Sequence, residues 1–222
     1  GPIISFFKRN GFKIAIGILG FIFLFKIGEA FLGRMSIVFY NEMGFSKGDI
    51  ALYSKGIGWI TTVIFTLLGG LFAIRSGVVK AMFISGILMA ATNLLFAALA
   101  WSGKSEWLFA VAVLLDDIAA AFATVAFVAF ISLLVDRTYT ATQYALLASI
   151  GTLGRTTLAG SSGWMVDTLE KGGNLILFSR FSLSIPSVEN PWAVFFVITT
   201  VMVIPSLILL WFIRNKLKLK LR

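Results

Sequence analysis

Seven charged side chains lie within stretches of sequence that are otherwise almost wholly apolar. They are Lys26, Glu29, Arg34, Lys55, Asp116, Asp117 and Arg155. A charge at the depth of a lipid bilayer costs roughly 3 kcal/mol or more, so it persists where it is paired, hydrated or functional. Bases of this kind can bind an anion and acids can carry a proton, which makes these residues the candidate functional site. The alternative is a set of internal salt bridges that only fixes the register of neighbouring helices.

The composition indicates a membrane protein and excludes several classes of function. Of the 222 residues, 59% are hydrophobic and 13% are charged, whereas soluble domains carry about a quarter charged residues. The chain has no cysteine and no histidine, which removes thiolate metal sites and the commonest general base and metal ligand. We therefore expect no metal and no cofactor. The net charge of +9 follows from basic residues around the membrane spans, so we expect no nucleic-acid partner.

An enzyme is not expected either. The run Gly160-Ser-Ser-Gly163 fits the motif of an intramembrane serine protease, but that serine needs a histidine to activate it. Since the chain has none, tight helix packing is the better interpretation of the motif.

The hydrophobic pattern predicts an all-α integral membrane protein with one six-helix transmembrane domain over residues 1–222. A helix needs about 20 apolar residues to cross the hydrocarbon, and the stretches that qualify are 13–40, 50–74, 80–101, 107–135, 143–166 and 191–213. Ser46 three residues before Asp49 predicts a helix start. The loop 167–190 is apolar in its middle but too short to cross. Partial alternation at Ser179–Ile185 indicates a short strand or hairpin, with an interfacial segment as the alternative.

Basic residues predict the orientation. With both termini cytoplasmic, the inner loops and tails hold Lys8, Arg9, Lys13, Arg75, Lys80, Arg137, Arg214, Lys216, Lys218, Lys220 and Arg222. The outer loops, including the extracytoplasmic loop 167–190, then hold Lys47, Lys104, Lys171 and Arg180. This excess of positive charge inside is typical of multi-pass membrane proteins.

A helical rise of 1.5 Å per residue converts position into depth. Lys26 then lies about 20 Å from the inner start of its span at residue 13, and Arg155 about 18 Å from the inner start of its span at residue 143. The Asp116–Asp117 pair lies about 14 Å from the outer start of its span at residue 107. These residues and Glu29 share a central layer, and Arg34 and Lys55 share a second layer nearer the outer face. The adjacent aspartates point about 100° apart on a helix, so they do not share one partner. Which of the two faces a cavity stays open.

Two stretches carry a family resemblance. They are Lys26-Ile-Gly-Glu-Ala-Phe31 and Tyr139-Thr-Ala-Thr-Gln-Tyr-Ala-Leu-Leu-Ala-Ser-Ile-Gly-Thr-Leu-Gly-Arg155, the latter followed by Gly163-Trp164. Both resemble the C-terminal half of the muropeptide permeases of AmpG type, in the major facilitator superfamily. The related acetyl-CoA transporters share a similar layout. A loop signature of the superfamily is partly present at Gly70…Ile74-Arg75-Ser76-Gly77, where Ile74 replaces the usual Asp.

The resemblance implies half of a proton-coupled transporter that imports anhydro-muropeptides across the bacterial inner membrane for cell-wall recycling. Proton coupling would then run through Glu29, Asp116 and Asp117, since there is no histidine. The residues expected to bind substrate are Lys26, Arg34, Lys55, Gln143 and Arg155.

Superfamily sites lie between two halves near the bilayer midplane, so six spans supply one wall. The expected partners are therefore membrane lipid, a small anionic muropeptide-like substrate, the proton, and a missing N-terminal half or a second six-helix subunit. Two other functions fit the residues. One is transport of another organic anion such as acetyl-CoA or a sugar phosphate, and the other is a non-transporting six-span scaffold or partner subunit.

Overall fold

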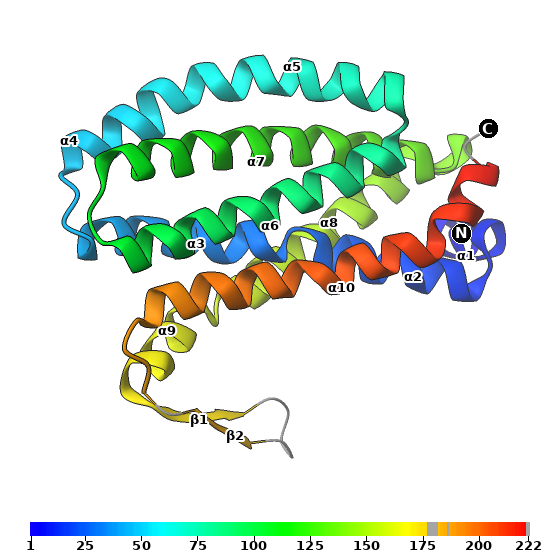
Figure 1. Ribbon diagram of the computed structural model, residues 1–222. Coiled ribbons are helices and arrows are strands. Elements are labelled where there is room, and N and C mark those ends of the chain that lie inside the picture. The colour runs from blue at the N-terminus through cyan, green and yellow to red at the C-terminus, as the bar shows by residue number, and fades with distance from the viewer. Residues whose placement is uncertain (177–181, 186, 221–222) are drawn as a thin grey trace.

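The structure is a computed structural model that describes residues 1–176, 182–185 and 187–220, and it is an all-α membrane protein (Figure 1). Its first part comprises α1 (Pro2–Asn10), α2 (Phe12–Phe25), α3 (Ile27–Glu42), α4 (Lys47–Ile50), the π-helical segment η1 (Ala51–Ile57), α5 (Gly58–Ser76) and α6 (Val78–Ser102). The second part comprises α7 (Glu106–Leu134), the 3₁₀ turn η2 (Arg137–Tyr139), α8 (Thr140–Ala159), α9 (Ser162–Lys171), β1 (Gly173–Ile176), β2 (Ser182–Ile185) and α10 (Pro191–Lys220).

Five helical stretches in the described part of the chain are long and apolar enough to cross a membrane: Phe12–Glu42, Lys47–Ser76, Val78–Ser102, Glu106–Leu134 and Pro191–Asn215. They coincide with five of the predicted spans. The predicted span 143–166 corresponds to α8 and the start of α9. It is not among the five because Gln143, Arg155 and several threonines lower its hydropathy. The span 143–166 therefore stays a prediction.

The long helices pack side by side in an order that differs from their order in the sequence. α7 lies between α5 and α6, and α10 packs on both α6 and α2, while α8 packs against α2 and α3 (Figure 1). The two ends of the chain lie at the same end of the bundle. Only 17% of the apolar window around α5 is buried, against 39–50% for the other four spans. α5 is therefore the least covered of these helices.

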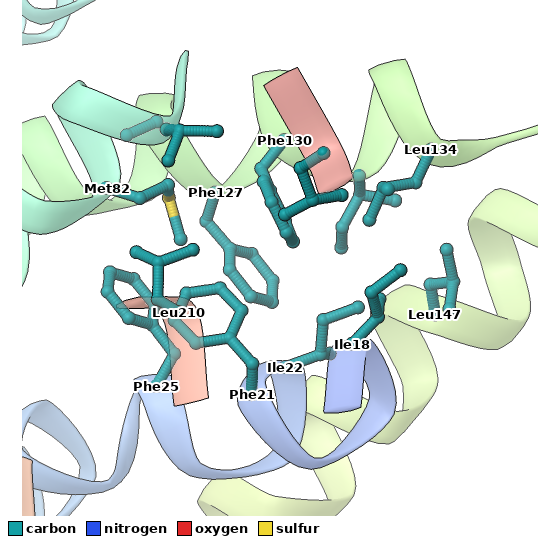
Figure 2. Packing of buried hydrophobic residues seen from close by; sticks show 14 of the residues in the cluster. Ile18, Phe21, Ile22, Phe25, Met82, Phe127, Phe130, Leu134, Leu147 and Leu210 are labelled. Carbon is teal, nitrogen blue, oxygen red and sulfur yellow. The ribbon is translucent and has the colours of Figure 1, made fainter. Parts of the chain in front are cut away.

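Two hydrophobic clusters hold the bundle together. One gathers Phe21 and Phe25 from α2 with Phe127 and Phe130 from α7 and Leu210 from α10 (Figure 2). The other contains Phe39 and the rings in contact with it: Tyr40, Phe96, Trp192 and Phe196. Aromatic rings bury 150–250 Å² each and favour tilted or edge contacts. Each cluster draws side chains from at least three helices, so it fixes where those helices lie.

The local signals for helix starts are confirmed at two positions. Ser46 caps α4 in a capping box with Asp49, which satisfies backbone donors at the helix start. Pro191 opens α10, where its missing N–H is not needed. The loop after α9 forms a hairpin in which β1 pairs antiparallel with β2, from Gly173 opposite Ile185 to Ile176 opposite Ser182. Residues 179–181 of the strand or hairpin predicted for 179–185 lie outside the described residues.

Candidate functional site

Lys26 lies between α2 and α3, and its side chain crosses to α7. Its backbone dihedrals of φ −90° and ψ 11° depart from helical values, although the Ala30 amide still donates to its carbonyl oxygen at 2.9 Å. Lys26 Nζ donates to Thr124 Oγ1 at 3.0 Å and lies 5.8 Å from the centroid of the Phe127 ring. Nζ is also 3.3 Å from Glu29 Oε2, and the two side chains are 12% and 17% exposed. Lys26 thus holds a largely buried ion pair.

Asp116 faces α6 and belongs to a group of three acids. Thr92 Oγ1 is 3.2 Å from Asp116 Oδ1 and 3.0 Å from the Met89 carbonyl oxygen, so the hydroxyl can donate to either. The charges of Glu29 and Asp117 act on Asp116. Glu29 Oε2 receives no hydrogen bond within the part of the chain that the structure describes, so charge alone joins it to Lys26. Asp116 therefore lies close enough to both other carboxylates for their charges to act on it.

Asp117 faces the junction of η1 and α5. A Cβ atom added at Gly58 would overlap Asp117 Oδ2, so the glycine makes room for the carboxylate. This oxygen is buried and has no hydrogen-bond partner among the described residues. Lys55 on η1 is the cation whose charge acts on it. The two aspartates therefore have different neighbours, as their angular separation on the helix predicts.

The two arginines of the predicted site are exposed. Arg155 follows Gly154, where a Cβ atom would overlap the Phe23 carbonyl oxygen, so α8 lies directly against the α2 backbone. Phe23 is three residues before Lys26, which places Arg155 within about 5 Å of the level of Lys26 along α2. Arg34 lies on α3. Neither arginine has a hydrogen bond or ion pair to the described residues, so both guanidinium groups are available to an anion.

Gln143 lies apart from these residues and contacts backbone. Its side chain is buried, with Nε2 donating to the Pro2 carbonyl oxygen at 2.8 Å and Oε1 accepting from the Asp136 amide at 2.6 Å. Ser5 Oγ also donates to Asp136 Oδ2 at 2.9 Å. Together these bonds hold α1 on the turn between α7 and α8.

The structure adds residues that sequence reasoning missed. Thr124, Thr92 and Gly58 each contact one of the charged groups. Thr124 lies seven residues after Asp117, which is two turns along the same helix face. That periodicity could have identified Thr124. No spacing in the sequence pairs Thr92 or Gly58 with α7, because those contacts join different helices.

The fold and the site define a multi-pass membrane protein with partly buried acids and, apart from Lys26, exposed cations. No family model matches the chain. It is 31% identical over 97% of its length to a Rickettsia conorii protein named putative transporter AmpG 4. It is also 28% identical over 98% of its length to the anhydromuropeptide permease of Escherichia coli strain K12, and 27% identical over 96% to putative transporter AmpG 1 of Rickettsia prowazekii.

The chain belongs to the AmpG-type permease family, as its residues 26–31 and 139–155 indicated. These relatives are named as transporters or permeases rather than as enzymes, in agreement with the sequence analysis. The chain spans less than half the length of the curated relatives it matches, with 46% of the first and 40% of the second covered.

Proposed function

We propose that this chain forms half of a proton-coupled secondary transporter that imports anhydro-muropeptides across the bacterial inner membrane. The observation that carries the proposal is the contrast between its charges. The charges of Glu29 and Asp117 act on Asp116 inside the bundle, whereas Arg34 and Arg155 are exposed and unpaired among the described residues. A set of purely structural salt bridges would neutralise its charges internally. Here two arginines stay without an acidic partner among the described residues, so they can bind an anion.

The three acids are suited to carry the proton. Their mutual repulsion is relieved when one carboxylate takes up a proton. Protonation of Glu29 would also end its ion pair with Lys26, which is then held by Thr124 and can meet a substrate carboxylate. Proton arrival and anion binding are thereby linked through one lysine.

Four bases are suited to bind the substrate: Lys26, Arg34, Lys55 and Arg155. Anhydro-muropeptides carry peptide carboxylates, and arginine binds carboxylates through two parallel hydrogen bonds. Gln143 is not carried into this set, because both ends of its amide already bond to backbone.

The uncovered helices suggest where the remaining wall of the site lies. Sites of this superfamily form between two six-helix halves, and α5 is largely exposed along its apolar length. We assign this surface to an N-terminal half or to a second six-helix subunit. We further propose six spans, with α8 and the start of α9 as the fifth, and both termini in the cytoplasm. The shared end of the two termini and the excess of basic residues there support this orientation.

Uptake of labelled muropeptide by the full-length protein in proteoliposomes tests the proposal. With an imposed proton gradient, Glu29→Gln and Arg155→Ala should reduce uptake at least tenfold, which corresponds to about 1.4 kcal/mol. Lys171→Gln is the control, since Lys171 is an exposed cation at the end of α9. If both variants reach the membrane and transport at the control rate, the site assignment fails.

The exposed cations fit a second substrate class equally well, namely acetyl-CoA or a sugar phosphate. A competition panel separates the two classes. If acetyl-CoA or a sugar phosphate is the substrate, muropeptide must fail to compete for its uptake. The scaffold alternative requires a full-length protein that transports none of these anions.

A further inference from the structure

A pocket lies away from the central acids, between α3 and the α4–η1 segment. Its volume is about 290 Å³. The residues that line it are Ile37, Asn41, Lys47, Ile50, Ala51 and Lys55. It therefore combines two cations and one amide with apolar walls, and none of its lining residues is an acid.

Residue spacing explains how this pocket is built. Lys47, Ala51 and Lys55 recur every four residues and so lie on one face of their helical segment. The small Ala51 between them leaves a gap between the two ammonium groups. Ile37 and Asn41 have the same spacing on α3 and form the opposite wall. π-helical segments such as η1 are frequent at functional sites.

The acids nearest in sequence are engaged elsewhere. Glu42 Oε2 accepts a hydrogen bond from Trp192 Nε1 at 2.6 Å. Asp49 Oδ2 accepts from Ser46 at 2.7 Å within the capping box. Lys47 itself has no hydrogen bond or ion pair to the residues that the structure describes, so its charge is not locally neutralised.

Lys55 connects this pocket to the central acids. It lines the pocket, and its charge acts on Asp117, yet it forms no ion pair or hydrogen bond with any described residue. An anion in the pocket would therefore compete with Asp117 for this lysine.

We propose that this pocket is a carboxylate-binding site that receives the anionic end of the substrate before the central layer does. Lys47 and Lys55 hold the carboxylate across Ala51, Asn41 donates from its amide, and Ile37 and Ile50 form the apolar walls. The inference rests on the proposed function for the identity of the substrate. The site itself requires only a carboxylate ligand.

Lysine acylation of the full-length protein in nanodiscs tests the site without transport. Mass spectrometry measures acylation rates at Lys47, Lys55 and the control Lys171, with and without muropeptide. We expect the ligand to slow acylation about threefold or more at the two pocket lysines and not at Lys171, as a bound charge pair would. Muropeptide with amidated carboxylates should give no protection.

Two further probes separate the ligand chemistries. Citrate, a simple carboxylate, should protect the pocket lysines, and inorganic phosphate should not at the same concentration. The proposal is overturned if only phosphate protects the pocket lysines from acylation, or if muropeptide, citrate and phosphate all fail to protect them. Muropeptide uptake measured in parallel reports separately on the proposed function. If citrate protects the pocket lysines but muropeptide is neither taken up nor protective, the proposed function is contradicted and the carboxylate site is still supported.

Kinetics of the full-length protein give an independent check. Lys47→Gln should raise the KM for muropeptide about tenfold, the effect of one charge-assisted contact, and Lys47→Arg should restore it. Ala51→Leu keeps both charges but fills the gap, so it should raise the KM as well. If Lys47→Gln and Ala51→Leu both leave the KM at the Lys171→Gln value, the pocket does not receive the substrate.

Discussion

Removing Lys26 should leave a buried carboxylate without its cation. Lys26 Nζ and Glu29 Oε2 are 3.3 Å apart and their side chains are 12% and 17% exposed. At an effective dielectric constant of about 20, such a pair attracts by about 5 kcal/mol, and desolvation offsets a large part of this. Breaking a buried pair by deleting one partner costs roughly 3–5 kcal/mol. Lys26→Met should therefore lower the free energy of unfolding by about 3 kcal/mol, the lower end of this range, because both side chains keep some exposure to solvent.

A double-mutant cycle isolates this interaction. Lys26→Met, Glu29→Gln and the double variant are unfolded with SDS in mixed micelles, and helix content is followed by circular dichroism. The free energy of unfolding of the double variant should be about 2 kcal/mol higher than that of Lys26→Met. The neutral amide that replaces the Glu29 carboxylate leaves no unpaired charge. A coupling energy within about 0.5 kcal/mol of zero would refute the buried-pair reasoning. Loss of the Thr124 hydrogen bond is common to Lys26→Met and the double variant, so it cancels in their comparison.

Three other changes probe the surroundings of the site. Gly154→Ala places a Cβ atom on the α2 backbone and should cost about 2 kcal/mol in the same SDS assay, whereas Gly163→Ala meets nothing within 4 Å and should be neutral. Thr92→Val removes the hydroxyl that can donate to Asp116 on α7 or to the Met89 carbonyl oxygen; it should cost about 1–2 kcal/mol and change the pH profile of uptake. The Thr138 amide donates to Asp136 and holds the pKa of that carboxyl below its ordinary value. The stabilisation from the ionised Asp136 carboxylate is present above the unfolded-state pKa of about 4 and is lost as pH falls through the lower folded-state pKa. Asp136→Asn removes this dependence, so the melting temperature of the variant should decline less steeply in acid.

The positions of the spans could be predicted from the sequence because hydrophobic length is a one-dimensional property. The predicted span 107–135 and the observed Glu106–Leu134 differ by one residue at each end. The predicted start at 191 coincides with α10. The short α1 was not predicted, since nine residues are too few to give a membrane signal.

The contacts between the charges could not be derived in this way. Depth gives the level of a residue but not the direction in which its side chain points. It therefore grouped Lys55 with Arg34, whereas the structure also connects Lys55 to Asp117. The π-helical geometry of Ala51–Ile57 changes the direction of side chains there, and no residue pattern in that segment predicts it.

Gln143 shows a different limit. It lies in the run that most resembles the family, and a polar residue in an apolar span suggests a binding role. The structure places it against the backbone of Pro2 and Asp136. The sequence could not separate these roles, because a side-chain amide is equally suited to a substrate and to a neighbouring peptide group.

The bonds from Gln143 to Pro2 and from Ser5 to Asp136 attach α1 to the start of α8. Alternating access requires helices of the two halves to rock past each other. Any tilt of α8 would carry α1 with it, and α8 also carries Arg155. A force applied to the segment around Pro2 would therefore reach the arginine along α8, whose Leu147 also packs in the first hydrophobic cluster. α1 can thus act as a lever on the position of that cation.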